Sequence, residues 1–443
     1  MSDTGGFRRA MLVMTASSML VPVVGIVTAP ILAQALGVAG RGEAAAAVAP
    51  NLLVVSVATL GLPEALTFHL AKRPHSSRVA LWWASLFSAA LGAACLIGVF
   101  FATSFLSAGD EELADLMVLG TALAIPALFV NLLRGAASGR QMWTAVALER
   151  ISNSVLRLVA LAVLALTGHL DVLNAVLVMT IAPVVAGAVY WKLALAPPVP
   201  PAELGPQPRI ASALLSFGSK IWLGAVASML MARLSQLLVI PLSDAAQLGI
   251  LVVAITISDV PFIVAQTVRD VVFGADSARA DPERLALTAR LTTLIALAGS
   301  LVLGGSLPLW ISRLFGEGFE EAIGPTWLLL ASSVILVPGL IAGAGLASAG
   351  RPGLRSMALV VALVTNLVGL VVLVPPLGAL GAAAAALLGS AFSTAFGVVM
   401  VSKLVSMPAV AFLLPRRSDV DVLSAEGMRA VRRVTGRGGR VRR

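Results

Sequence analysis

LRGAASGRQMWTAVALERISNSVLRLVALAVLALT, residues 133–167, is the stretch that decides the fold. It begins as a polar elbow and continues as an apolar helix long enough to cross a bilayer. Arg157 lies about 21 Å along this helix from Trp143, at roughly 1.5 Å per residue. That position is inside a hydrocarbon core roughly 30 Å thick, where an arginine costs at least about 2.5–3.5 kcal/mol. Arg157 therefore needs a wet cavity or a partner.

The composition of the whole chain predicts many membrane spans and little soluble domain. The 443 residues are 58% hydrophobic and 12% charged, with a mean hydropathy of +0.97, whereas soluble proteins carry roughly 25% charged residues. The single cysteine excludes an internal disulfide. Three scattered histidines form no ligand cluster, so we predict no metal site and no cofactor. The net charge of +9 belongs to short loops and a tail, which argues against a nucleic-acid partner.

Apolar segments of spanning length recur along the chain and predict an all-α polytopic membrane protein with about twelve transmembrane helices. Their expected limits are 11–36, 44–70, 79–106, 116–133, 142–167, 172–195, 214–241, 245–268, 291–312, 325–349, 356–374 and 381–406.

Lysine and arginine are concentrated on one side of these spans. Most of the 31 basic residues lie in the N-terminus, the even-numbered loops and the tail, whereas only Arg41 and Arg313 lie in the opposite loops. Loops rich in Lys and Arg stay inside the cell. We therefore expect both termini to be cytoplasmic.

A proline-rich segment divides the predicted spans into six and six. The fourth and tenth spans end in the similar sequences ASGR (137–140) and SAGR (348–351), which favours a parallel repeat about an axis along the membrane normal. We expect two pseudo-symmetric six-helix lobes around a central cavity, and a disordered tail that lies against anionic lipid. The expected parts are an N-terminal lobe (1–195), a cytoplasmic linker (196–213), a C-terminal lobe (214–406) and a basic cytoplasmic tail (407–443).

Charged residues within the fifth span are the first candidate site residues. Arg157 either forms an ion pair with an acid on a neighbouring helix or faces a substrate cavity. Arg150, two turns away on the same face, either snorkels to the cytoplasmic surface or lines that cavity. Glu149 either neutralises a basic residue of another span or titrates as a coupling carboxylate.

Further candidates lie in other spans. Arg233 of the seventh span and Asp259 of the eighth are both interior and could pair, although their expected depths differ by about two turns. Glu64, late in the second span, is interpreted as an interfacial residue that couples or pairs charges. The interior arginines, set against a smaller acidic set, predict a cavity of positive potential. Arginine binds phosphate bidentately, so this cavity suits a phosphate-bearing substrate better than a cationic drug.

The chain resembles the polysaccharide flippases, the Wzx-like branch of the multidrug/oligosaccharidyl-lipid/polysaccharide exporter superfamily. The resemblance rests on the twelve spans, on QALGVAGRGEAAAAVAPNLL (34–53) and on LLRGAASGRQMW (132–143). It implies transport of an undecaprenyl-diphosphate-linked oligosaccharide from the inner to the outer leaflet of the bacterial cytoplasmic membrane, through a cationic cavity between two lobes. It also implies that Arg150, Arg157 and Arg233 serve the diphosphate, and that a polysaccharide polymerase and glycosyltransferases are candidate partners.

Three other functions stay open. A drug/cation antiporter of the same superfamily would need a dominant acidic site inside a lobe. A lipid II flippase shares the cationic cavity but often has helices beyond twelve. A membrane-embedded glycosyltransferase or ligase would need a large extracytoplasmic loop or an acidic cluster near the surface, and the outer loops here are short. The sequence therefore favours a transporter that works by alternating access over an enzyme.

Overall fold

The computed structural model describes residues 4–73, 76–194, 210–276, 282–348, 351–405 and 408–413, and within these ranges it contains helices and no strands. The expected linker and basic tail lie outside the described residues, except for 210–213 and 408–413. The elements are α1 (Thr4–Ala58), α2 (Leu62–Lys72), α3 (Ser77–Leu106), α4 (Glu111–Ala122), α5 (Ala124–Gly139), α6 (Trp143–Leu166), α7 (Val172–Ala186), η2 (Gly187–Tyr190), α8 (Trp191–Ala194), α9 (Ile210–Leu242), α10 (Ala245–Asp276), α11 (Pro282–Phe315), η4 (Phe319–Ala322), α12 (Ile323–Ser348), α13 (Pro352–Val405) and α14 (Val410–Leu413).

The predicted twelve-helix membrane fold is confirmed. Eight described stretches are long and apolar enough to cross a membrane. Two of them, Leu20–Ala58 and Gly353–Leu404, have the length of two crossings, and each is broken at one glycine with non-helical backbone angles, Gly37 (φ 68°) and Gly378 (φ 52°). The remaining two crossings are α6, which has spanning length but three charged residues, and α9, with 33 residues.

The turn between the first two spans is shorter than the sequence predicted. The expected limits left residues 37–43 as a loop, but the helix resumes directly after Gly37. A positive φ is accessible to glycine without steric cost, so this one residue can reverse the chain. As a result, Arg41 lies within a helix and not in a loop.

Two compact units make up the chain. The first comprises Met1–Thr256, Pro308–Pro325 and Leu370–Ala382, and the second comprises Ile257–Leu307, Thr326–Gly369 and Ala383–Arg443. The lobe boundary expected at the linker and the cavity expected between the lobes stay predictions.

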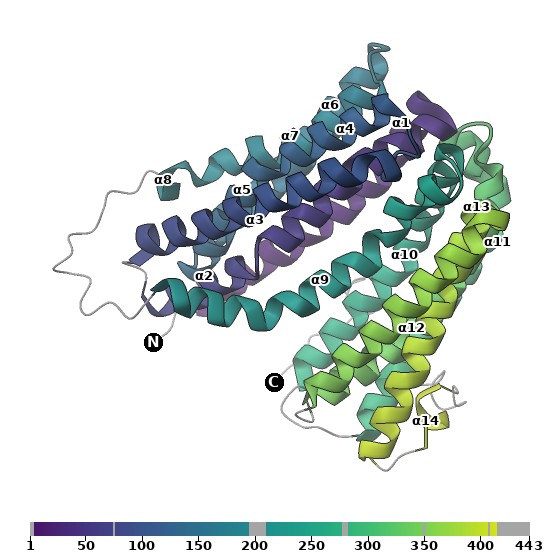
Figure 1. Cartoon of the computed structure of the whole chain (residues 1–443). Coiled ribbons are helices and arrows are strands. Elements are labelled where there is room, and N and C mark those ends of the chain that lie inside the picture. Colours follow the sequence, from purple (N-terminus) through teal and green to yellow (C-terminus); the bar gives the residue numbers. More distant parts are fainter. Residues whose placement is uncertain are drawn as a thin grey trace, which may run out of the picture. The chain divides into compact units, whose positions relative to one another are not determined.

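In the first unit, α1, α6 and α7 pack against one another, as Figure 1 shows in purple and blue. The seventh span, α9, packs against α1, α2 and α3 of the same unit. The indole nitrogen of Trp222 on α9 donates a hydrogen bond to the backbone oxygen of Val57 (2.8 Å). That oxygen lies at the end of α1 and also accepts a hydrogen bond from the backbone nitrogen of Leu60 (3.3 Å), so the contact with Trp222 uses its second lone pair and holds α9 against the N-terminal helices.

Small residues bring α2 and α5 close together. The backbones of Gly135 and Gly139 lie against Pro63 and Thr67 of α2, and the Thr67 hydroxyl donates to the Gly135 carbonyl oxygen (2.9 Å). Small residues at an interface let transmembrane helices associate closely through van der Waals packing and polar contacts. They set the position of the elbow that carries Arg134 to Arg140.

We expect the Gly135→Ala variant to destabilise the protein, because its new methyl group would overlap the backbone of Pro63. Overpacking of this kind costs about 1–3 kcal/mol. Gly98→Ala is the matched control, since a methyl group at that helical position meets no atom within 4 Å. The midpoint of thermal unfolding in detergent measures both variants. Equal midpoints for Gly135→Ala and the wild type would contradict the packing described here.

In the second unit, α11, α12 and α13 enclose an apolar core that includes Ala286, Ile341 and Val398. The Ser332 and Ser390 hydroxyls lie 2.8 Å apart and join α12 to α13. Buried polar groups paired in this way join neighbouring helices inside a membrane protein.

Candidate functional site

A buried ion pair joins α5 to α6 in the first unit. Arg134 donates from Nε to Oε2 of Glu149 (3.0 Å) and from Nη2 to Oε1 (2.9 Å), so the contact is bidentate. The Tyr190 hydroxyl also donates to Oε2 of Glu149 (3.4 Å), and Nη1 of Arg134 donates to Oδ1 of Asn131 (3.0 Å). Glu149 is 0% exposed, and both of its oxygens are satisfied. The structure thus places Glu149 in a charge-pairing contact.

Arg134 is a residue that the sequence interpretation missed. It lies in the polar elbow, where counting by loops assigned it to the cytoplasmic surface. Helix α5 continues to Gly139, which brings the Arg134 side chain back against α6. A glutamate in an apolar span needs a cationic partner. Arg134 is a basic residue at the end of the preceding span, so a search for the partner of Glu149 among neighbouring spans could have identified the pair.

Arg157 lies on α6 opposite α1. Its Nε is buried without a hydrogen-bond partner. A methyl group added at Gly25 of α1 would lie 3.9 Å from Nη2 of Arg157. The guanidinium group of Arg157 therefore lies close to the backbone of α1 at Gly25.

Arg41 is the second residue that the sequence interpretation missed. It was expected to lie in a loop, but the structure leaves it only 6% exposed, and its Nε is also buried without a hydrogen-bond partner. Burial is the larger electrostatic cost to the charged Arg41 guanidinium group, and the positive charge of Arg157 adds to it. Neither residue forms an ion pair within the described part of the chain. We call Arg41 and Arg157 the arginine pair.

Electrostatics make the arginine pair a candidate anion site. Two like charges in a medium of low dielectric constant repel strongly, and each buried charge costs free energy unless it is neutralised or hydrated. A phosphate or carboxylate group between the two would neutralise both and satisfy their N–H donors, since guanidinium groups bind oxyanions bidentately. The arrangement can therefore hold an anion and would repel a cation.

The other predicted site residues are distributed over several helices. Arg150 is half-buried on α6, and Glu64 is exposed on α2. Arg233 of α9 is half-buried and donates from Nη1 to Oε1 of Gln236 (3.0 Å). Asp259 of α10 is exposed and belongs to the second unit, so its pairing with Arg233 of the first unit stays a prediction.

Comparison with known proteins places the chain in a family. The sequence profile of the family described as "Polysaccharide biosynthesis protein" matches residues 7–273. The chain belongs to this polysaccharide biosynthesis protein family. No curated protein matches it at a significant level.

Several solved structures share the fold of the chain. One is the lipid II flippase MurJ in an inward closed conformation (TM-score 0.71, 11% identity, 91% of this chain and 89% of that chain covered). Another is an inward-facing multidrug resistance MATE family transporter of the MOP superfamily (TM-score 0.66, 17% identity, 86% and 95% covered). A third, from Pyrococcus furiosus, is an MOP superfamily transporter described as having a binding pocket of reverse polarity (TM-score 0.57, 16% identity, 90% and 94% covered). The resemblance to the flippases of that superfamily is confirmed, and the fold is that of a multi-pass membrane transporter.

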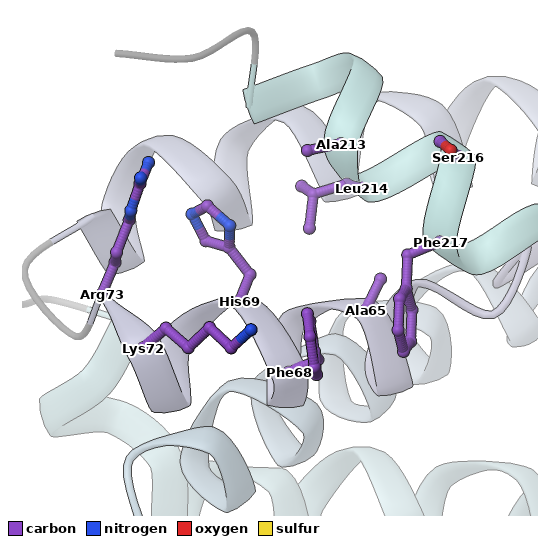
Figure 2. A pocket seen from close by; sticks show the side chains of 9 residues that line it. All are labelled: Ala65, Phe68, His69, Lys72, Arg73, Ala213, Leu214, Ser216 and Phe217. Carbon is purple, nitrogen blue, oxygen red and sulfur yellow. The ribbon is translucent and has the colours of Figure 1, made fainter. Parts of the chain in front are cut away.

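The chain also has a basic pocket between α2 and α9 (Figure 2). Its volume is about 380 Å³. Its polar lining comes chiefly from one end of α2, where His69, Lys72 and Arg73 lie within one and a half turns. Its apolar lining includes Phe68 and Phe217, whose rings stack with centroids 4.7 Å apart. The sequence interpretation had assigned this end of α2 only to the membrane interface.

Proposed function

We propose that this chain flips a lipid-linked oligosaccharide of the undecaprenyl-diphosphate type across the bacterial cytoplasmic membrane, for the synthesis of a cell-surface polysaccharide. The observation that carries the proposal is the arginine pair: Arg41 is 6% exposed and Arg157 is half-buried, and the Nε atom of each is buried without a hydrogen-bond partner. A diphosphate carries at least two negative charges, and it can accept hydrogen bonds from both guanidinium groups at once. Arg150 and Arg233 would extend the same positive field along α6 and α9.

Alternating access is the mechanism that this fold class uses. The lobes would expose a midplane site first to the cytoplasm and then to the outside. The lipid tail would stay in the bilayer, because only the polar head needs shielding from hydrocarbon. The membrane potential contributes about 2.3 kcal/mol per charge per 100 mV, and an inside-negative potential favours outward movement of an anionic head. In this proposal both termini are cytoplasmic, no chemical step is catalysed, and a polymerase and glycosyltransferases act before and after transport.

Deletion of the gene in its own host tests the proposal against drug efflux. We expect loss of the surface polysaccharide and accumulation of its lipid-linked precursor in the inner leaflet, because the head group can no longer cross. Resistance to cationic dyes should stay unchanged, since a positive site does not bind cations. Expression of the wild-type gene from a plasmid is the control. Normal polysaccharide combined with dye sensitivity would contradict the proposal and favour the cation antiporter.

A further inference from the structure

The basic pocket between α2 and α9 is separate from the arginine pair in sequence and in surroundings. It is formed by the last two turns of α2 and the first two turns of α9. The Lys and Arg pattern predicts that this end of both helices is cytoplasmic. A lipid arriving from the inner leaflet would therefore meet this pocket before it reached a site deeper in the membrane.

Two permanent cations, Lys72 and Arg73, lie at this pocket. Figure 2 shows the His69 ring reaching into the space between the two helices, with Lys72 and Arg73 beside it. None of the described residues that line the pocket is acidic. The Ser76 hydroxyl donates to the Arg73 carbonyl oxygen (2.8 Å), so Nε2 of His69 donates to Oγ of Ser76 (3.0 Å), and this contact fixes the ring. The N-terminal end of α9 adds the positive end of a helix dipole. Together these groups favour a bound oxyanion.

The apolar side of the pocket fits the hydrocarbon part of a lipid. Phe68 is 48% exposed although it stacks on Phe217. Nζ of Lys72 lies 4.1 Å from the centre of the Phe68 ring, so the ammonium group and the aromatic surface are held side by side by a cation–π contact. A ligand that places an anionic group on Lys72 and an acyl or prenyl chain on the Phe68 ring would use both surfaces.

We propose that this pocket binds the diphosphate group of the lipid-linked substrate at the cytoplasmic surface, as a loading site that precedes the arginine pair. The inference rests on the proposed function. A diphosphate fits better than a phosphodiester because Lys72 and Arg73 supply two permanent charges. A phosphodiester lipid carries one charge and would leave one of the cations unneutralised. Basic pockets between helices on the cytoplasmic side are known to hold phosphate-bearing head groups.

Calorimetric titration of the purified full-length protein in neutral detergent tests the loading site. The probes are farnesyl diphosphate, farnesyl monophosphate and short-chain phosphatidylglycerol. An Arg157→Ala background removes the deeper site. In that background we expect the double variant Lys72→Gln/Arg73→Gln to bind farnesyl diphosphate at least about tenfold more weakly, as the loss of charge-assisted hydrogen bonds predicts.

The matched control is the double variant Arg140→Gln/Lys192→Gln in the same background. It removes two exposed basic residues from the first unit on the same predicted cytoplasmic side, and Lys192 also lies over an aromatic ring, that of Trp191. We expect this control to bind farnesyl diphosphate within twofold of its parent. If both double variants bound farnesyl diphosphate equally weakly, general surface charge would explain the loss of affinity, and the loading site would be overturned.

Three further outcomes separate the loading site from the proposed function. Phosphatidylglycerol that competes as well as farnesyl diphosphate would make the occupant a bulk phospholipid and overturn the assignment. Unchanged diphosphate binding in the Lys72→Gln/Arg73→Gln variant, with polysaccharide export still dependent on Arg157, would overturn the loading site alone. Wild-type protein that binds no diphosphate lipid would overturn the proposed function as well. Because Lys72 and Arg73 are exposed, unchanged thermal unfolding is expected for the variant.

Discussion

The Arg157→Ala variant is expected to lose about 90–99% of polysaccharide export while the protein remains inserted and abundant. A hydrogen bond to a charged group contributes about 1.5–3 kcal/mol, and each 1.4 kcal/mol is a factor of ten. Arg157→Lys should restore export only in part, because an ammonium group keeps the charge but lacks the bidentate fork. Quantification of surface polysaccharide, with membrane protein measured on blots, gives the result.

Arg140→Ala is the matched control for this experiment, because Arg140 is an exposed arginine at the start of the same elbow-to-helix segment. Thermal stability separates the two interpretations of Arg157 that the sequence left open. If Arg157 binds an anion, its removal relieves the repulsion from Arg41, and the Arg157→Ala protein should unfold at the same temperature or higher. Normal export by Arg157→Ala, or a large drop in its unfolding temperature, would remove Arg157 from the site.

The second large effect is expected at the buried ion pair between Arg134 and Glu149. Glu149→Gln leaves the Arg134 guanidinium without its carboxylate partner in a largely buried place. Breaking a buried pair by removing one partner costs about 3–5 kcal/mol. We therefore expect a clearly lower unfolding temperature and less protein in the membrane.

A double variant, Arg134→Gln/Glu149→Gln, provides the control for this effect. Because both charges are removed, no uncompensated charge stays buried, and the double variant should be more stable than Glu149→Gln alone. The same thermal unfolding measurement in detergent compares the three proteins. If Glu149→Gln matched the wild type in stability while export was lost, Glu149 would be a coupling carboxylate and not a structural partner.

The fold could be predicted from the sequence because its determinant is local. A continuous apolar run of about 20 residues specifies a spanning helix whatever it packs against. The turn at Gly37 could not be predicted, since the residues after it look polar enough for a loop, and only the backbone shows that the helix resumes there. Arg41 was missed for that reason.

The candidate site could be predicted only in part, because its geometry depends on packing between helices. An arginine deep in an apolar span is visible in the sequence, so Arg157 was identified. Its neighbour Arg41 lies more than a hundred residues away, and the contact between α1 and α6 brings them together. The partner of Glu149 was likewise set by the approach of α5 to α6, which no periodicity in either helix reveals.

Translocation in reconstituted vesicles is the most direct test of the claim that the arginine pair carries a lipid diphosphate across the membrane. A fluorescent lipid-linked oligosaccharide is placed in the outer leaflet, and a membrane-impermeant reductant then destroys the label that remains outside. We predict that wild-type protein protects a growing fraction of the label and that Arg157→Ala protects it at least about tenfold more slowly. Equal rates for the two proteins, or no protection by the wild type, would contradict the account.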